Sequence, residues 1–318
     1  MIEKYYSGVI EQIYNRIGKE TRNIVMANYS NDFSIENLEV IRRYQSNEDN
    51  VFFAYSEFSY NTLIGAYEPF LDIICNMHRR FIGGSFDDFQ KECGVYYLHR
   101  QVLNSYYETG ECFREEMVLL NEVAYEQRRM TMAIADMLKR LSEVKPLMIV
   151  INRFQMASKS SIETIKYLID NPCANIGIVL GVNALVKGAD STVEVWDSIV
   201  ESLEDRSAVY YIGSAGQLKN TVKTTNDDEM YITMNFEQSI QEASNIMEFL
   251  DFEQAKRGCR IIEHKLKFED AWIDEKSLRR FYMVYARTSV LLAEMSKAIE
   301  LTNEFKALIP ENDSEHYL

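Results

Sequence analysis

The sequence predicts an α/β protein with a mainly parallel, five-stranded sheet flanked by helices, followed by a helical C-terminal part. Two continuous apolar runs, Leu147–Ile151 and Asn175–Val182, have the pattern of strands buried on both faces of a parallel sheet. Three further runs also have strand character: Asn23–Ala27, Asn50–Phe58 and Ala208–Ile212. Strands that alternate with helices favour a single parallel sheet with right-handed crossovers.

The segments between these strands carry apolar residues at helical spacing. In residues 3–17, for example, Tyr6, Ile10 and Ile13 lie on one face of a helix. Further helices are predicted up to Arg43, over 63–79, over Glu111–Glu143, after the serines of 158–161, and over Val193–Leu203, with short helices between 81 and 109.

The polar stretch Lys219–Glu229 marks the best domain boundary. We predict an α/β domain over residues 1–222 and a helical domain over 231–318, with an edge strand at Tyr231–Met234. In the helical domain, one hairpin is expected from two long helices at about 236–267 and 275–308.

Such a hairpin is the unit of a helical repeat array, and an array that ends on one unit exposes an apolar face. Either the chain is part of a longer protein, or the hairpin packs back on the sheet.

Composition narrows the classes of function. There are 49 acidic against 34 basic residues, a net charge of −15, so a broad nucleic-acid surface and binding to anionic membranes are not expected. The five cysteines are spread without CxxC spacing, which indicates reduced thiols in a cytoplasmic protein and no metal centre. The first residues do not have the pattern of a signal peptide, and no apolar run approaches the 18 residues of a membrane span.

The polar pair Asn152-Arg153 directly follows the Leu147–Ile151 strand. In α/β sheets, ligands bind at the carboxyl ends of strands, so this pair lies at a candidate site. The stretch resembles the Walker B region of the signal-transduction ATPases with numerous domains, the STAND branch of AAA-type P-loop NTPases. In that family the strand is followed by two acids and an aromatic-rich turn that ends Ala-Asp. Here the two acids fall on Asn152 and Arg153, and the last acid falls on Ser158.

The resemblance extends to the loop after the first predicted strand. A P-loop needs glycines that let backbone N–H groups wrap the phosphates, a lysine, and a Ser/Thr hydroxyl on Mg²⁺. On this loop the family's glycines fall on Asn28, Asn31 and Phe33, its lysine on Ser34 and its Ser/Thr on Ile35. None of these positions keeps the required residue type, and Asp32 or Ser34 is better explained as the cap of the next helix.

Two more features match the family. The cluster Ala66-Tyr67-Glu68-Pro69-Phe70 resembles its Pro-Tyr-x-Pro-Phe segment, which is structural. Asn183 follows the Asn175–Val182 strand, where AAA-type enzymes place the polar sensor of the γ-phosphate, although an Asn at a strand end also caps turns.

The resemblance implies a P-loop-type fold that has lost its nucleotide machinery. We therefore predict a non-catalytic signalling or regulatory module, a pseudo-ATPase of STAND type with no catalytic residue, no cofactor and no metal. Its partners are expected to be proteins or output domains of the same polypeptide, as in bacterial transcription regulators or diguanylate cyclases, and not nucleic acid or membrane.

The alternative is a nucleotide-binding ATPase switch that uses non-standard residues. In that case Arg153, Arg22 or Lys19 supplies positive charge to the phosphates, and Asn28 or Asn183 contacts the base or ribose.

Overall fold

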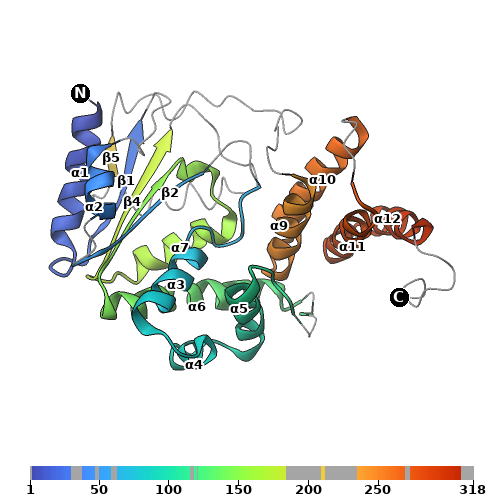
Figure 1. Ribbon diagram of the computed structural model, residues 1–318, viewed down its shortest axis with the longest axis horizontal. Helices are drawn as coiled ribbons and strands as arrows, with labels where there is room; N and C mark the ends of the chain where they lie inside the picture. The colour runs from blue at the N-terminus through green and yellow to red at the C-terminus, as the bar shows by residue number, and fades with distance from the viewer. Residues whose placement is uncertain are drawn as a thin grey trace. The chain divides into compact units, whose positions relative to one another are not determined.

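The computed structural model describes residues 2–29, 38–46, 50–58, 63–114, 118–119, 121–183, 209–211, 235–268 and 273–308. The chain divides into two compact units, drawn in Figure 1. The first consists of Met1–Tyr60, Tyr67–Arg100 and Arg128–Asn226, and the second of Asn61–Ala66, Gln101–Gln127 and Asp227–Leu318. The chain therefore enters each unit three times. The boundary predicted between residues 222 and 231 lies outside the described residues and stays a prediction.

The first unit is built on a parallel sheet with the strand order β2-β3-β4-β1-β5. Among the described residues, four strands form its body: β1 (Ile24–Tyr29), β2 (Phe52–Glu57), β3 (Leu147–Asn152) and β4 (Ile176–Asn183). In place of the full fifth strand expected over Ala208–Ile212, three residues, β5 (Val209–Tyr211), pair with β1. The predicted α/β class and the parallel sheet flanked by helices are confirmed.

Helices cover both faces of this sheet (Figure 1). On one face, α1 (Ile2–Arg16) and α2 (Glu39–Ser46) share a core with the strands, in which Ile10 and Ile41 join Val25. On the other face lie α6 (Val123–Val144) and α7 (Lys159–Asp170). Along the sheet, the connection from β1 to β2 runs in one direction, and the connections from β2 to β3 and from β3 to β4 run in the other. Because the crossovers are right-handed, the helices of these two sets of connections lie on opposite faces of the sheet.

A glycine lets the end of α1 approach the sheet closely. A Cβ atom on Gly177 of β4 would lie 2.8 Å from Ile17 Cδ1 and 2.9 Å from Ile13 Cγ2. The missing side chain therefore makes room for the two isoleucines directly against the strand.

Smaller helices connect β2 to α6. They are α3 (Phe70–Met77), continued by a π-helical turn His78–Ile82, then α4 (Phe86–Glu92) and α5 (Tyr97–Thr109). The helix expected over Glu111–Glu143 begins only at Val123, because the described residues before it are engaged otherwise: the Cys112 N–H donates to Asn245 Oδ1 at 2.9 Å. The predicted helix Val193–Leu203 and strand Tyr231–Met234 lie outside the described residues.

The described part of the second unit contains four helices near the C-terminus: α9 (Phe236–Glu248), α10 (Phe252–Phe268), α11 (Glu275–Leu291) and α12 (Met295–Ala307). The expected pair of long helices is wrong, because a turn interrupts each of them, at Leu250 with φ +69° and at Ala293 with φ +60°. The result is two consecutive hairpins, with α11 packed against α9, α10 and α12.

An earlier part of the chain completes the core of this second unit. Leu63 is buried with the apolar residues of α9 and α10, and a Cβ on Gly258 would lie 2.7 Å from Leu63 Cδ2. None of the helices in the described residues combines the length and the apolar character that crossing a membrane requires.

Candidate ligand site at the carboxyl edge of the sheet

Three of the predicted positions lie at one edge of the sheet. Asn28 is the last but one residue of β1, Asn152 ends β3 and Asn183 ends β4. Because the strands are parallel, their carboxyl ends meet at the same edge, where Tyr29 pairs with Asn183 in register. Only the backbone of Asn28 and Asn183 is described. The remaining P-loop-like positions, Asn31, Phe33, Ser34 and Ile35, lie outside the described residues.

The strand order places a topological switch point at this edge. β1 lies between β4 and β5, the chain leaves β1 towards β2 on one side, and it continues from β4 to β5 on the other side. In open α/β sheets, the crevice at such a point is where ligands bind. The carboxyl ends of β1 and β4 are therefore the place where the topology favours a ligand.

Beside this point, the end of β3 is closed by an ion pair. Arg153 Nη1 lies 3.0 Å from Glu57 Oε1, and the two side chains are only 20% and 18% exposed. Glu57 ends β2 and pairs in register with Asn152, so the ion pair joins the ends of two neighbouring strands. The Phe58 N–H donates to Asn152 O at 3.2 Å and Arg153 Nη1 to Phe58 O at 3.4 Å, which extends the same connection.

The groups of this ion pair have further partners. The Tyr55 hydroxyl donates to Glu57 Oε2, so both carboxylate oxygens of Glu57 are engaged. Asn152 is fully buried, and its Oδ1 accepts from the Arg153 N–H at 3.0 Å. Where the Walker B acids of a nucleotide-binding P-loop protein hold Mg²⁺, this edge has a buried amide and a neutralised guanidinium.

Ser158, the position of the family's last acid, caps a helix instead. Its Oγ accepts from the Ser161 N–H at the start of α7. The hydroxyls of Ser160 and Ser161 bind the segment before α3. The Tyr67 N–H donates to Ser160 Oγ at 3.0 Å, and Ser161 Oγ donates to Glu68 O at 2.7 Å. These serines therefore stabilise the unit.

Two cations proposed for the alternative function lie at the wrong edge. Lys19 and Arg22 precede Ile24, the first residue of β1, so they stand at the amino end of that strand. Six strand residues, about 20 Å at roughly 3.3 Å each, separate them from the carboxyl edge. Lys19 Nζ donates to Asn15 O at 2.9 Å. Of the three cations considered, only Arg153 lies at the candidate site.

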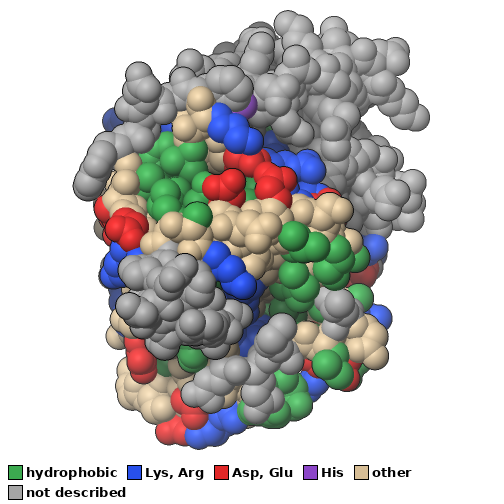
Figure 2. Space-filling model, turned by 90° about the vertical axis from the view of Figure 1, so that its right-hand side faces the viewer, with side chains coloured by type: hydrophobic (Ala, Val, Ile, Leu, Met, Phe, Trp, Pro, Cys, Tyr) green, Lys and Arg blue, Asp and Glu red, His purple; other side chains and the backbone are tan. Residues whose placement is uncertain are grey.

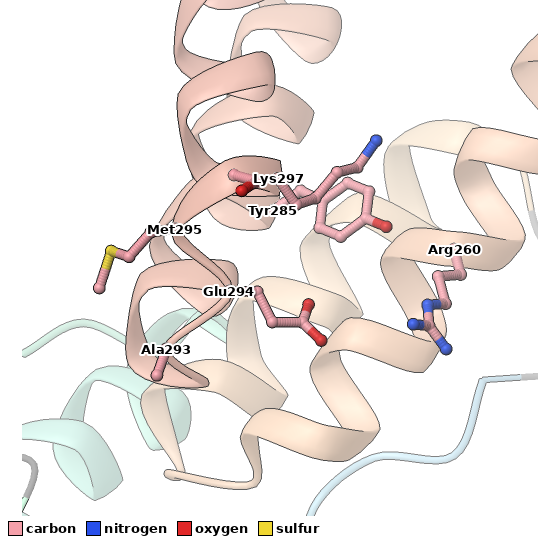
Figure 3. Close-up of a pocket in the computed structure, with 7 residues that line it drawn as sticks. Arg260, Tyr285, Ala293, Glu294, Met295 and Lys297 are labelled. Atoms are coloured by element: carbon pink, nitrogen blue, oxygen red, sulfur yellow. The ribbon is translucent and has the colours of Figure 1, made fainter.

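A separate pocket of about 470 Å³ lies in the second unit, between the two hairpins (Figure 3). Arg260, Tyr285, Glu294 and Lys297 are among its lining residues. Lys297 Nζ lies 2.9 Å from Glu263 Oε1 and 2.8 Å from Glu300 Oε1.

Burial lowers the pKa of Lys297, but hydrogen bonds to Glu300 and Glu263 outweigh this effect, so its pKa is raised and the amine stays charged. Glu294 pairs with Lys256. The charges of Lys297 and Glu294 in this pocket are therefore balanced by neighbouring side chains.

Among the described residues, no cluster of three or more His, Cys, Asp or Glu side chains could hold a metal ion. The sequence matches no model of a known protein family, and comparison with curated proteins gives no significant match. The function is therefore inferred from the site itself.

Proposed function

We propose that this chain is a non-catalytic signalling or regulatory module. In this proposal its α/β unit has the scaffold of a STAND-type ATPase without the nucleotide chemistry, and it acts by protein–protein contacts within a larger bacterial signalling protein. The observation that carries the proposal is the ion pair between Arg153 and Glu57 at the end of β3.

A bound Mg-nucleotide needs a carboxylate that holds the metal and a cation on the phosphates. At this edge the cation is already neutralised at 3.0 Å, and the carboxylate is shared between Arg153 and Tyr55. Using either group for a ligand would require breaking a largely buried ion pair. That costs about 2 kcal/mol for a pair of this burial, between the roughly 1 kcal/mol of an exposed pair and the roughly 3–5 kcal/mol of a fully buried one.

The topology supports the other half of the proposal. β1 is followed by α2 and lies at the switch point of a parallel sheet, which is where a P-loop-type domain has its phosphate loop. The scaffold is therefore consistent with a nucleotide-binding ancestor, while the charges at the end of β3 favour a structural role.

Thermal unfolding with and without millimolar Mg-ATP tests the proposal. A ligand at 100 times its dissociation constant stabilises the native state by about 2.7 kcal/mol, which raises Tm by at least about 5 °C in a domain of this size. We expect no shift for the wild-type protein. A shift of several degrees would refute the proposal and support the nucleotide-binding switch.

The variant Glu57→Gln serves as a matched comparison, because it removes the charge that neutralises Arg153 and keeps the shape of the side chain. A shift with Mg-ATP in this variant alone would show that the ion pair is what keeps phosphate away.

A further inference from the structure

The connection from β2 to α3 passes through both units within a few residues. Asn61–Ala66 belongs to the second, helical unit, and Tyr67 is again part of the α/β unit. Two residues of this connection, Leu63 and Tyr67, are fixed by buried contacts, one in each unit. Four residues of chain span at most about 14 Å when fully extended. Because the connection is so short, it can absorb only a small displacement of either fixed point.

Leu63 is fixed in the core of the helical unit. Its side chain is 4% exposed and is buried with Ala243 of α9 and other apolar residues. Gly258 of α10 makes room for it, since a Cβ atom there would lie 2.7 Å from Leu63 Cδ2. The backbone is bound as well, because Gln254 Nε2 donates to Ile64 O at 3.4 Å. We call this position of Leu63 beside Gly258 its socket.

Tyr67 is fixed in the α/β unit. Its ring is buried, its hydroxyl oxygen lies 3.4 Å from Thr131 Oγ1, and its N–H donates to Ser160 Oγ at 3.0 Å. Its φ of +59° lies in the left-handed region, which is unusual for an aromatic residue. Such a conformation persists only where the surrounding structure holds it, and it is often found in segments that switch. Tyr67 is therefore a strained residue at the point where the chain returns to the α/β unit.

A network of buried serine hydroxyls joins Tyr67 to the turn after Arg153. Ser158 Oγ lies 3.0 Å from Ser160 Oγ, which accepts the hydrogen bond from the Tyr67 N–H. Two residues before Ser158, the Met156 N–H donates to Arg153 O at 2.9 Å. The path from Tyr67 to the ion pair at the end of β3 therefore consists of buried hydrogen bonds and a short stretch of chain.

This connection is the part of the path that can change conformation. The helices α5 and α6 also run from one unit into the other, but their backbones are held by their own hydrogen bonds. Leu63–Tyr67 belongs to no helix or strand and depends on its two fixed points. These are buried residues, apart from the hydrophobic patches that Figure 2 shows between charged side chains on one side of the molecule.

We propose that the connection Leu63–Tyr67 couples the helical unit to the turn after Arg153. With Leu63 in its socket, Tyr67 is kept in its strained conformation and its N–H on Ser160. When Leu63 is released, Tyr67 relaxes to a negative φ, which turns the chain before it against the chain after it and loosens the serine network. By linkage, loosening the network favours the release of Leu63 by the same factor.

The coupling rests on the proposed function, because a module that transmits a signal needs a path from the carboxyl edge of the sheet to another part of the protein. It adds the regulated element, the turn after Arg153, and the residue of the helical unit that responds to it, Leu63.

Hydrogen exchange of single backbone amides in the full chain, measured without nucleotide, tests the coupling. Leu63→Ala empties the socket beside Gly258. The N–H groups of Met156 and Ala157, 93 and 94 positions further along the chain, should then exchange at least about 10-fold faster. The matched control is Leu301→Ala, because Leu301 belongs to the same core and is 2% exposed against 4% for Leu63, but lies on α12. It should leave both amides within about twofold of the wild-type rate.

Ser160→Ala tests the opposite direction, because it removes the acceptor of the Tyr67 N–H. It should speed the exchange of the α10 amides near Gly258 by about fivefold or more. The control is Ser142→Ala: Ser142 is also buried, but its Oγ donates to Lys139 O within α6. It should leave the α10 amides unchanged.

Circular dichroism establishes that each variant is folded, and Leu63→Val replaces Leu63→Ala if the latter does not fold. Unchanged exchange at Met156 and Ala157 in the folded Leu63 variant would overturn the proposal. Equal acceleration by Leu301→Ala would also overturn it, because any loss of stability in the helical unit would then have the same effect. So would equal exchange near Gly258 in Ser160→Ala and Ser142→Ala. A shift of Tm with Mg-ATP would instead refute the proposed function and leave these exchange rates as they are.

Discussion

The ion pair between Arg153 and Glu57 should make a measurable contribution to the stability of the α/β unit. Exposed pairs contribute about 0.2–1 kcal/mol, and removing one partner of a fully buried pair costs about 3–5 kcal/mol. At 3.0 Å and with side chains 20% and 18% exposed, this pair lies between the two cases. We expect Arg153→Met to lower the free energy of unfolding by about 2 kcal/mol.

The backbone at Arg153 allows a second, graded variant. Its φ of +54° lies in the left-handed region, which costs a residue other than glycine roughly 1 kcal/mol. Arg153→Gly removes the ion pair but also this cost, so it should destabilise by about 1 kcal/mol, roughly half the effect of Arg153→Met. If the two variants were equally unstable, the backbone would not contribute as argued.

Urea denaturation of the wild type, Arg153→Met, Glu57→Gln and the double variant forms a double-mutant cycle. We expect a coupling energy of about 1–2 kcal/mol, since both groups act through one contact. A coupling below about 0.3 kcal/mol, the usual error of additivity, would refute the reasoning. Arg140→Met is the control: Arg140 pairs with Glu143 at 2.6 Å, but both side chains are more than half exposed, at 53% and 57%. Its effect should stay within about 0.5 kcal/mol.

Three further predictions concern other parts of the chain. In urea denaturation, Gly177→Val should lower the free energy of unfolding by about 1–3 kcal/mol, because the valine side chain would collide with Ile13 of α1. Gly8→Ala should leave the free energy of unfolding unchanged or raise it by up to about 1 kcal/mol, because a Cβ atom at Gly8 would have no atom within 4 Å. Burial raises the pKa of Glu263, but hydrogen bonds from two lysines outweigh this and lower its pKa. The ionised carboxylate therefore stabilises the fold at neutral pH, and this effect is lost as the pH falls through the folded-state pKa. Glu263→Gln should lower Tm at pH 7 but much less at pH 3. Equal losses of Tm at the two pH values would contradict this. Burial raises the pKa of the Cys259 thiol, so mass spectrometry should find iodoacetamide on the partly exposed Cys173 first and on Cys259 only after unfolding.

The central strands could be predicted because their apolar runs are continuous. Leu147–Ile151 and Asn175–Val182 correspond to β3 and β4 within one residue at each end. The order of the strands could not be predicted, because it is decided by crossovers between distant segments. For that reason the partner of Arg153 could not be predicted from the sequence. Glu57 is 96 positions away and becomes its neighbour only when β2 pairs with β3.

The two turns in the helical unit were missed for a local reason. Leu250 and Ala293 adopt the left-handed conformation in which glycine is the usual residue. Because neither position is a glycine and no proline lies beside them, the sequence has no signal for the end of a helix there. The apolar spacing also continues across both turns, which favoured two long helices over four shorter ones.

The interlaced course of the chain has a consequence for how the protein can be made and dissected. Leu63 and residues 110–114 complete the helical unit, yet they leave the ribosome more than 100 residues before α9. Until then, these segments must wait without their native contacts, which exposes apolar side chains to chaperones or to aggregation. A fragment that starts at α9 would lack the same pieces, so cutting the gene at the polar stretch should yield an incomplete fold rather than an independent domain.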